Sequence, residues 1–249
     1  MKNLVSRVVL EGIFILMLAV AAFGQQTATI PEANIQNAVT YTDLGLAKEK
    51  KGDLNGAMAD FNRAIKLNPG DSAAYNARGV LRKKRGDLDG AMADYDQAIQ
   101  LKPKYAFAYN NRGNVRRKKG DLNGAVAEYN RAIMLKPTYP SPYKNRGYVK
   151  FIKGDVDGAL ADYNQAIKLN PSYAFAYNDR GIVRERKGDL DGAMADFNQA
   201  ITINPKYAAA YRNRGEIKRK KGDINGAVAD FNHAVKLGLH SADIAETPD

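Results

Sequence analysis

The sequence predicts an all-α solenoid made of six tandem helical hairpins, each 34 residues long. Two stretches with helical spacing of apolar residues occur in every unit, and a lone hairpin cannot bury its apolar face, so neighbouring units must stack. The period is fixed by a Gly-Asp pair that recurs without insertion or deletion. The glycines of these pairs are Gly52, Gly86, Gly120, Gly154, Gly188 and Gly222.

We number positions 1 to 34 within each repeat, starting with Ala38 as position 1 of the first repeat. The six repeats then span 38–71, 72–105, 106–139, 140–173, 174–207 and 208–241. Residues 1–24 are predicted to form a signal peptide, residues 25–37 a polar leader and residues 242–249 a short acidic tail. The repeats thus form one elongated domain, because a solenoid needs no single central core.

The first helix of the second repeat has Tyr75, Gly79 and Leu81 at helical spacing. Its positions 11 to 14 read RKKR, and every repeat has basic residues there. Cations interact favourably with the negative end of a helix, which is one interpretation of this basic stripe. The other is a surface that attracts acidic partners.

The turn and the second helix follow directly. Gly86 suits a left-handed helix stop, and Asp87 suits the N-cap of the next helix. Apolar residues at helical spacing then extend from Leu88 to Ile99, and Pro103 closes the hairpin.

This pattern resembles the tetratricopeptide repeat family. The family's aromatic, Gly, Ala, aromatic, Ala and Pro positions are met at positions 4, 8, 20, 24, 27 and 32 in register along the array, except that the sixth repeat has Leu239 at position 32. The resemblance implies a right-handed superhelical solenoid in which the first helices line a concave groove that binds peptides.

Three positions depart from the family pattern or are unusual in a helix. Position 7 is Arg in repeats two to six, and we predict that it pairs with the acid at position 23 of the preceding repeat, as in Arg78 with Asp60. The alternative is that the Arg at position 7 pairs with the acid at position 23 of its own repeat. Position 11 is Lys or Arg throughout, with its stem expected on the seam and its head in water. Position 19 is always Gly, for which a close helix approach is one explanation.

Composition narrows the possible chemistry. The chain has no Cys, which excludes a disulfide and a thiolate metal site. The two histidines, His233 and His240, are expected to face solvent and not to bind a metal. The sequence contains no nucleophile–base pair, phosphate-binding Gly loop or metal-ligand cluster, so we expect a non-enzymatic protein without a cofactor.

The N-terminus is predicted to direct export. Lys2 and Arg7 precede an apolar run over 12–23, and Ala22 and Gly24 form a small-x-small cleavage pattern. The run is shorter than the roughly 20 residues that cross a bilayer. The chain is therefore expected to be periplasmic or secreted, and an uncleaved membrane anchor is the alternative.

The leading function is a protein-interaction scaffold whose groove holds a peptide or a partner helix. In the family that the chain resembles, the groove contacts come largely from first-helix positions 2, 5, 6, 9, 12 and 13. Repeat four has an apolar patch there, and the flanking cations favour a partner with acidic character. Asparagines are expected to bind a peptide backbone. The predicted site residues are Phe107, Asn110, Asn111, Asn114, Lys144, Asn145, Tyr148, Phe151, Ile152, Phe175, Asn178 and Arg212.

Two alternatives use the charge of the chain, which is +11. One is electrostatic binding of an anionic envelope polymer or lipid surface. The other is nucleic-acid binding, which the export signal and the lack of a base-reading code disfavour. A salt titration distinguishes a charge-only binder from a groove binder.

The last helix is expected to expose apolar side chains. Few residues follow Leu237, too few to cover a whole helix face. Phe231, Ala234 and Leu237 are predicted to be partly exposed and to support self-association.

Overall fold

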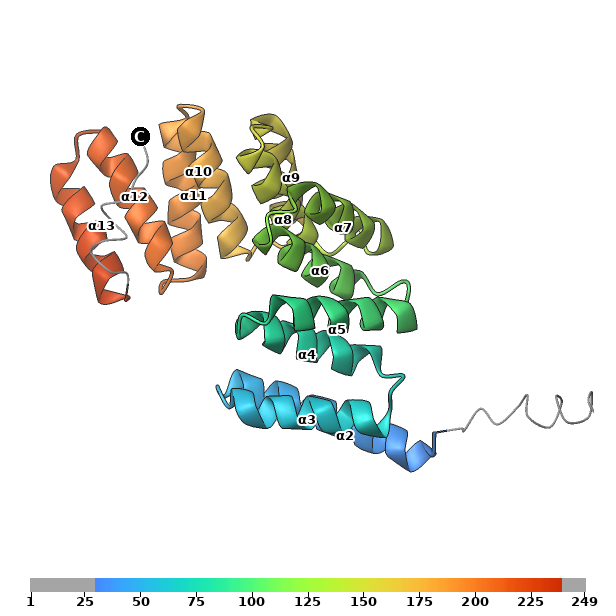
Figure 1. Cartoon of the computed structure of the whole chain (residues 1–249). Helices are drawn as coiled ribbons and strands as arrows, with labels where there is room; N and C mark the ends of the chain where they lie inside the picture. Colours follow the sequence, from blue (N-terminus) through green and yellow to red (C-terminus); the bar gives the residue numbers. More distant parts are fainter. Residues whose placement is uncertain (1–29, 239–249) are drawn as a thin grey trace, which may run out of the picture. The chain divides into compact units, whose positions relative to one another are not determined.

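The computed structural model describes residues 30–238, and over this range the chain forms twelve α-helices and no strand (Figure 1). It divides into two compact units, the first ending at Asp71 and the second starting at Ser72. The first unit contains α2 (Glu32–Lys50) and α3 (Leu54–Leu67). The second contains α4 (Ser72–Lys84), α5 (Leu88–Leu101), α6 (Ala106–Lys118), α7 (Leu122–Leu135), α8 (Pro140–Ile152), α9 (Val156–Leu169), α10 (Ala174–Arg186), α11 (Leu190–Ile203), α12 (Ala208–Lys220) and α13 (Ile224–Lys236).

Each repeat contributes one helix pair, so the predicted all-α solenoid of six hairpins is confirmed. The start of the first helix differs from the expected boundary. Helix α2 begins at Glu32, inside the segment 25–37 that the sequence assigned to a polar leader. The predicted signal peptide and acidic tail lie outside the described residues.

The turn inside each hairpin has the chemistry that the sequence predicts. The glycine at position 15 has a φ of 83° to 87° in all six repeats, a left-handed conformation that residues with a Cβ rarely adopt. The aspartate at position 16 caps the second helix, as in Asp87, whose side chain accepts a hydrogen bond from the N–H of Gly90 at 2.8 Å.

The capping carboxylate lies close to the glycine that recurs at position 19. A Cβ placed at Gly90 would lie 2.2 Å from an Oδ atom of Asp87, and the other five repeats give 2.0 to 2.1 Å. The position-11 cation of the facing helix also approaches this glycine, as in Arg116 Nη1, which would lie 2.8 Å from a Cβ at Gly124.

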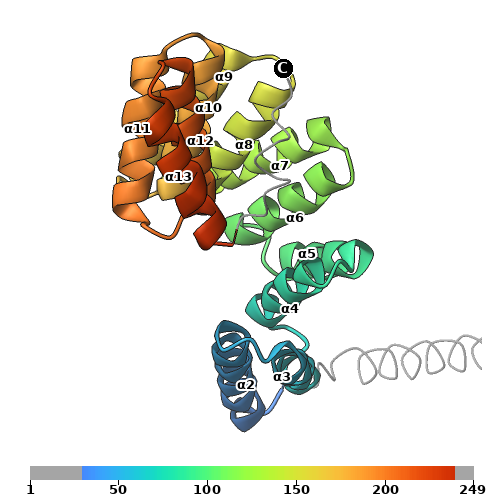
Figure 2. The ribbon, with the colours of Figure 1, turned by 90° about the vertical axis from the view of Figure 1, so that its left-hand side faces the viewer.

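The core of the second unit lies at the seams between repeats. Each seam joins the second helix of one repeat to the first helix of the next, as in the cluster of Ala125, Tyr129 and Val149. First helices of successive repeats also contact one another, from α4 and α6 to α10 and α12, whereas second helices make no contact of similar extent. The first helices therefore lie closer together and form the inner face of this unit. Figure 2 shows α10 to α13 side by side in a second view.

Candidate protein-binding site

Buried ion pairs hold the two helices of each hairpin together. The arginine at position 7 pairs with the acid at position 23 of its own repeat, so the predicted pairing with the preceding repeat is wrong. The five pairs and their N–O distances are Arg78–Asp94 at 2.6 Å, Arg112–Glu128 at 2.9 Å, Arg146–Asp162 at 2.5 Å, Arg180–Asp196 at 2.6 Å and Arg214–Asp230 at 2.6 Å. The two helices of one hairpin face each other across the whole of their length, which brings these two positions together.

The other arm of the same guanidinium does cross a seam. Arg146 Nη1 donates to Asn130 Oδ1 at 2.6 Å, and Arg112 Nη1 donates to Asp96 Oδ1 at 2.7 Å. Both acceptors stand at position 25 of the preceding repeat. One arginine thus ties its own hairpin to the previous one.

Position 11 carries a second cation for the same acid. Lys150 Nζ lies 3.0 Å from Asp162 Oδ2, and Arg184 Nη1 lies 2.9 Å from Asp196 Oδ2. The expectation that these heads lie in water is therefore wrong, because a buried carboxylate attracts them. Part of the predicted basic stripe neutralises buried acids and is not a free surface charge.

The titration of Asp230 shows what the two cations do. Burial raises the pKa of this carboxyl, but hydrogen bonds from Arg214 and Lys218 outweigh burial, so its pKa lies below the ordinary value. The acid is thus held in its charged form.

Along the inner face, a row of side-chain pairs joins successive first helices. Position 6 of one repeat pairs with position 5 of the preceding repeat. The amide pairs are Asn111 with Asn76 at 3.0 Å, Asn145 with Asn110 at 2.9 Å and Asn213 with Asn178 at 2.9 Å. We call this row the inner ladder. Its asparagines bind one another across the seams.

One pair of the inner ladder is an ion pair and not a pair of amides. Between α8 and α10 the pair is an ion pair, with Lys144 Nζ 3.2 Å from Asp179 Oδ2. Asp179 also contributes, after burial itself, to raising the pKa of the Tyr163 and Tyr207 hydroxyls. Arg212 stands at the last place of the ladder, on α12 at position 5.

An apolar patch lies at the C-terminal end of α8. It consists of Tyr148, Phe151 and Ile152, and we call it the α8 patch. Tyr148 is 37% exposed and Ile152 is 50% exposed, whereas Phe151 is half-buried against the cluster of Tyr163 and Val183. Phe151 thus packs partly against adjacent helices, and only part of its ring is available on the surface.

Arginines from both neighbouring repeats cover the rings of this patch. The guanidinium of Arg117 lies 4.9 Å from the ring centroid of Tyr148, and that of Arg186 lies 5.5 Å from the ring centroid of Phe151. Apolar side chains and cations are thus interleaved on one surface.

Phe107 and Phe175 start α6 and α10 and are 38% and 49% exposed. Each ring is in contact with a tyrosine at position 34 of its own repeat, with centroids 4.8 Å apart for Phe107 and Tyr139 and 4.9 Å apart for Phe175 and Tyr207. The sequence analysis missed these tyrosines. Their recurrence at position 34 in repeats two to five is the signal that would have identified them.

Asn114 supports the core at one side of this surface. Its side-chain oxygen accepts a hydrogen bond from the Tyr129 hydroxyl at 2.9 Å. Burial raises the pKa of Tyr129 to about 12, so this hydroxyl stays protonated and remains a donor at neutral pH. In repeat four the equivalent of Asn114 is Tyr148, which leaves the inner face apolar there.

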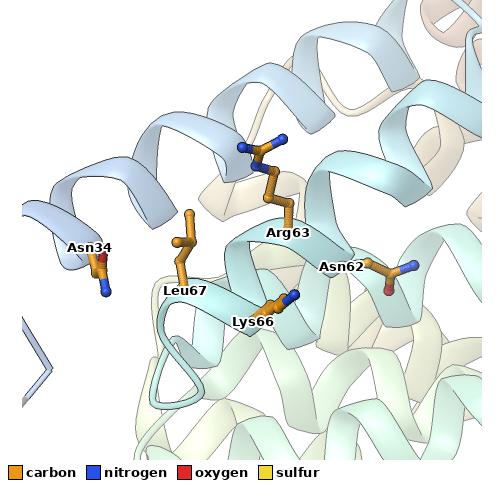
Figure 3. Close-up of a pocket in the computed structure, with 5 residues that line it drawn as sticks. All are labelled: Asn34, Asn62, Arg63, Lys66 and Leu67. Atoms are coloured by element: carbon orange, nitrogen blue, oxygen red, sulfur yellow. The ribbon is translucent and has the colours of Figure 1, made fainter.

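A shallow pocket lies elsewhere, in the first unit between α2 and α3 (Figure 3). Its lining contains two cations, Arg63 and Lys66, and the Arg63 guanidinium stacks 4.7 Å above the Tyr41 ring. None of the predicted site residues lines it.

Residues 30–238 contain no group of three His, Cys, Asp or Glu side chains placed to bind a metal ion. His233 is exposed and its ring centroid lies 4.2 Å from that of Tyr211, whereas His240 is outside the described residues. Among the described helices, none combines the length and the hydropathy needed to span a membrane.

Comparison with solved structures supports the fold. The crystal structure of the APC/C hetero-tetramer Cut9–Hcn1 matches with a TM-score of 0.79 and 16% identity, over 87% of this chain and 42% of that one. This chain therefore spans about two fifths of that relative. MamA matches with a TM-score of 0.54 and 26% identity, over 68% of this chain and 97% of MamA. YrrB, described as a TPR protein with an unusual peptide-binding site, matches with a TM-score of 0.53 and 24% identity, over 74% and 95% of the two chains.

No curated protein matches this sequence. Family models do match. A TPR repeat model covers residues 81–116, 113–151, 147–188 and 186–218, which is more than half of the chain. Two tetratricopeptide repeat models cover 61–93, and 38–71 with 208–237. The chain belongs to the tetratricopeptide repeat family.

Proposed function

We propose that this protein is an interaction scaffold that docks a segment of a partner protein on the inner face of repeats three to five. Proteins of this family generally mediate protein–protein interactions and are generally not enzymes. The single observation that carries the proposal is the α8 patch, which is apolar at positions 12 and 13, where every other repeat has charged residues.

The positions of the patch make the contrast clear. At positions 12 and 13 the third repeat has Arg117 and Lys118, and the sixth has two cations as well, whereas the fourth has Phe151 and Ile152. Exposed apolar side chains grouped on one surface typically mark an interaction site. A partner's apolar side chain would be buried against Tyr148 and Ile152.

The cations around the patch favour a partner with acidic residues. Arg117 and Arg186 stack on aromatic rings through their flat faces, and a stacked guanidinium still presents N–H groups at its edge. Those groups can bind a carboxylate in a bidentate manner. The partner segment therefore combines apolar anchors with flanking Asp or Glu.

The hydrogen bonds of the inner ladder limit how many asparagine groups can bind a partner's peptide backbone. Asn110 and Asn178 are 3% exposed and serve the ladder. Asn111 and Asn145 are half-buried and each donates one hydrogen bond to it. An amide side chain has two donors and a carbonyl oxygen, so these two retain groups for a peptide backbone. Phe107 and Phe175 provide further apolar contacts at the other ends of α6 and α10.

A peptide panel tests this proposal. The full chain is titrated with fluorescent peptides that combine one aromatic anchor with flanking Glu, with Lys in place of Glu, or with no anchor. We expect the acidic peptide with the anchor to bind most tightly. Tyr148→Ala should weaken that binding by about 2 kcal/mol, because an aromatic anchor at the centre of an interface contributes about this much.

Met134→Ala is the matched control, since Met134 is 63% exposed on α7 and lies outside the inner face. Lys83→Ala in repeat two is a second control. Ile152→Ser removes apolar surface without opening the core as Phe151→Ala would. If the three peptides bind equally, or if Tyr148→Ala and Met134→Ala have equal effects in folded protein, the groove proposal is wrong.

We further propose that the scaffold works outside the cytoplasm after loss of residues 1–24. The support is the sequence of that segment, with its cations, apolar run and small-x-small pattern. N-terminal sequencing of the protein from its native source is expected to give a first residue near Gln25. An intact Met1 on a membrane-bound form would show that the segment is an anchor.

A further inference from the structure

The two ends of the solenoid have open faces that match each other. In the four seams inside the second unit, the second helix is half-buried or buried at positions 17, 21 and 28 because the next first helix covers it. On α13 the same three positions are Ile224, Val228 and Val235, which are 56%, 51% and 41% exposed. Within residues 30–238 no helix covers this face of α13.

The internal seams show what covers such a face. The covering helix carries a small residue at position 3 and an aliphatic residue at position 10. Ala108 and Val115 fill these places on α6, Ala176 and Val183 on α10, and all are fully buried. The occupant that fits α13 is thus the first helix of a tetratricopeptide repeat.

Helix α2 is the first helix of the first repeat, and its apolar seam residue stands at position 7 and not at position 10. Its positions 3, 7 and 10 are Thr40, Leu44 and Ala47, all of them exposed. Position 7 is Arg in every other repeat, and an Arg there has its own acid and its own seam partner. Leu44 makes this surface apolar, which suits the apolar side chains of α13.

The two ends of the array also carry opposite charges at positions that pair in the inner ladder. The inner ladder joins position 5 of one repeat to position 6 of the next, and in the middle of the array this is the ion pair of Lys144 and Asp179. At the ends, position 5 of the last repeat is Arg212 and position 6 of the first repeat is Asp43. Neither makes an ion pair within residues 30–238, although Arg212 lowers the pKa of Glu216 through space after Arg219 and Lys220. Stacking one chain on another would form an Arg212–Asp43 pair in the geometry of Lys144 and Asp179.

A second polar contact has an internal counterpart. Position 14 pairs with position 18 of the preceding repeat, as in Lys153 Nζ with Asn123 Oδ1 at 2.7 Å. The same positions at the two ends are Lys51 and Asn225. The end faces therefore repeat the charged and amide pairs of an internal seam, and both also carry exposed apolar side chains.

We propose that a second copy of this chain docks head to tail, with its α2 on the α13 face of the first. Such an interface uses two different surfaces, so each added copy leaves one of each open and assembly continues to short filaments or closes to a ring. The interface is separate from the inner face of repeats three to five.

Sedimentation velocity of the full chain over a wide concentration range tests this. Arg212→Asp or Asp43→Arg alone places like charges opposite each other and is expected to weaken self-association about tenfold or more. The chain carrying both reversals should recover association to within about threefold of the wild type, because the pair is restored with its charges exchanged. All variants keep the same N-terminal segment, so its contribution cancels.

Lys168→Asp on α9 is the control for net charge, and it should not change association. If neither single reversal weakens association, or the double reversal gives no recovery, the proposal is overturned. Removing residues 239–249 tests another occupant of α13. If that deletion alone creates association and the reversals have no effect on it, the tail covers this face and the head-to-tail contact is wrong.

Discussion

The contacts between the two helices of a hairpin recur from repeat to repeat, whereas the residues on the inner face of the solenoid vary. Between the two helices of a hairpin, a buried acid and two cations recur in repeats two to six, and Gly at position 8 meets an aromatic ring in all six. On the inner face, positions 5, 6, 9, 12 and 13 change from repeat to repeat. The recurring ion pairs and glycines hold the two helices of each hairpin together. The varying inner-face positions give the fourth repeat a surface that its neighbours lack.

Removing a buried acid gives the largest expected effect. Asp196→Asn leaves Arg180 and Arg184 beside a neutral group in a buried place, so we expect a loss of about 3 kcal/mol in the free energy of unfolding. Denaturant titration followed by circular dichroism measures it. Asp191→Asn on the same helix is the control, since its pair with Lys221 is exposed to water and should contribute little to stability. Equal losses for both variants would contradict the importance of the buried pair.

Two glycines at position 8 provide the next test. A Cβ at Gly181 would lie 2.6 Å from the fully buried Phe197 ring, whereas at Gly147 the nearest side-chain atoms are 3.2 Å away. We expect Gly181→Ala to cost about 2 kcal/mol through overpacking. Gly147→Ala should change stability by less than about 1 kcal/mol, because Ala favours the helix and its neighbours need to shift only slightly to make room for the Cβ. A larger loss for Gly147→Ala would show that the repeats are packed differently.

A smaller effect is expected in the inner ladder. Lys144→Asn alone leaves the carboxylate of Asp179 without its cation and should cost about 1.5 kcal/mol. Lys144→Asn together with Asp179→Asn installs the amide pair of the neighbouring repeats and should restore most of that loss. Thermal unfolding of both single variants and the double variant measures the coupling. Additive losses would mean that the ion pair and the amide pairs are not equivalent.

The last test follows the contribution of a buried acid as the pH changes. The pKa of Asp230 is lowered on folding, so this acid stabilises the protein above its unfolded pKa of about 3.9, and the stabilisation is lost as pH falls through the lower folded pKa. The melting temperature of the wild type should therefore exceed that of Asp230→Asn at pH 7, and the difference should shrink below about pH 4. A difference that is constant with pH would contradict the ion-pair role of this acid.

Much of the framework could be predicted from the sequence because it depends on neighbours along the chain. The left-handed Gly86 and the cap of Asp87 are decided within a few residues, and helical spacing determines which side of a helix is apolar. The twelve helices and their stacking follow from these local signals and the period. The exposed side chains of Tyr148 and Ile152 could also be placed on the inner face from their positions in the repeat.

The tertiary structure alone decided which side chains meet. The sequence offers an Arg at position 7 two acids, one in its own repeat and one in the preceding repeat, and helical phase does not tell them apart. The packing of the hairpin brings Arg78 to Asp94, which also draws the cation at position 11 out of water. Similarly, the asparagines face one another because successive first helices lie close together.

The last helix shows the same division. The predicted partial exposure holds for Phe231 and Leu237 and is wrong for Ala234, and the sequence analysis missed the most exposed apolar residues of this helix. Ala234 is fully buried and Phe231 and Leu237 are half-buried against their own hairpin, while the open face belongs to Ile224, Val228 and Val235. An apolar pattern tells which residues avoid water, whereas exposure depends on which neighbour is present, and that is fixed only when the repeats are stacked.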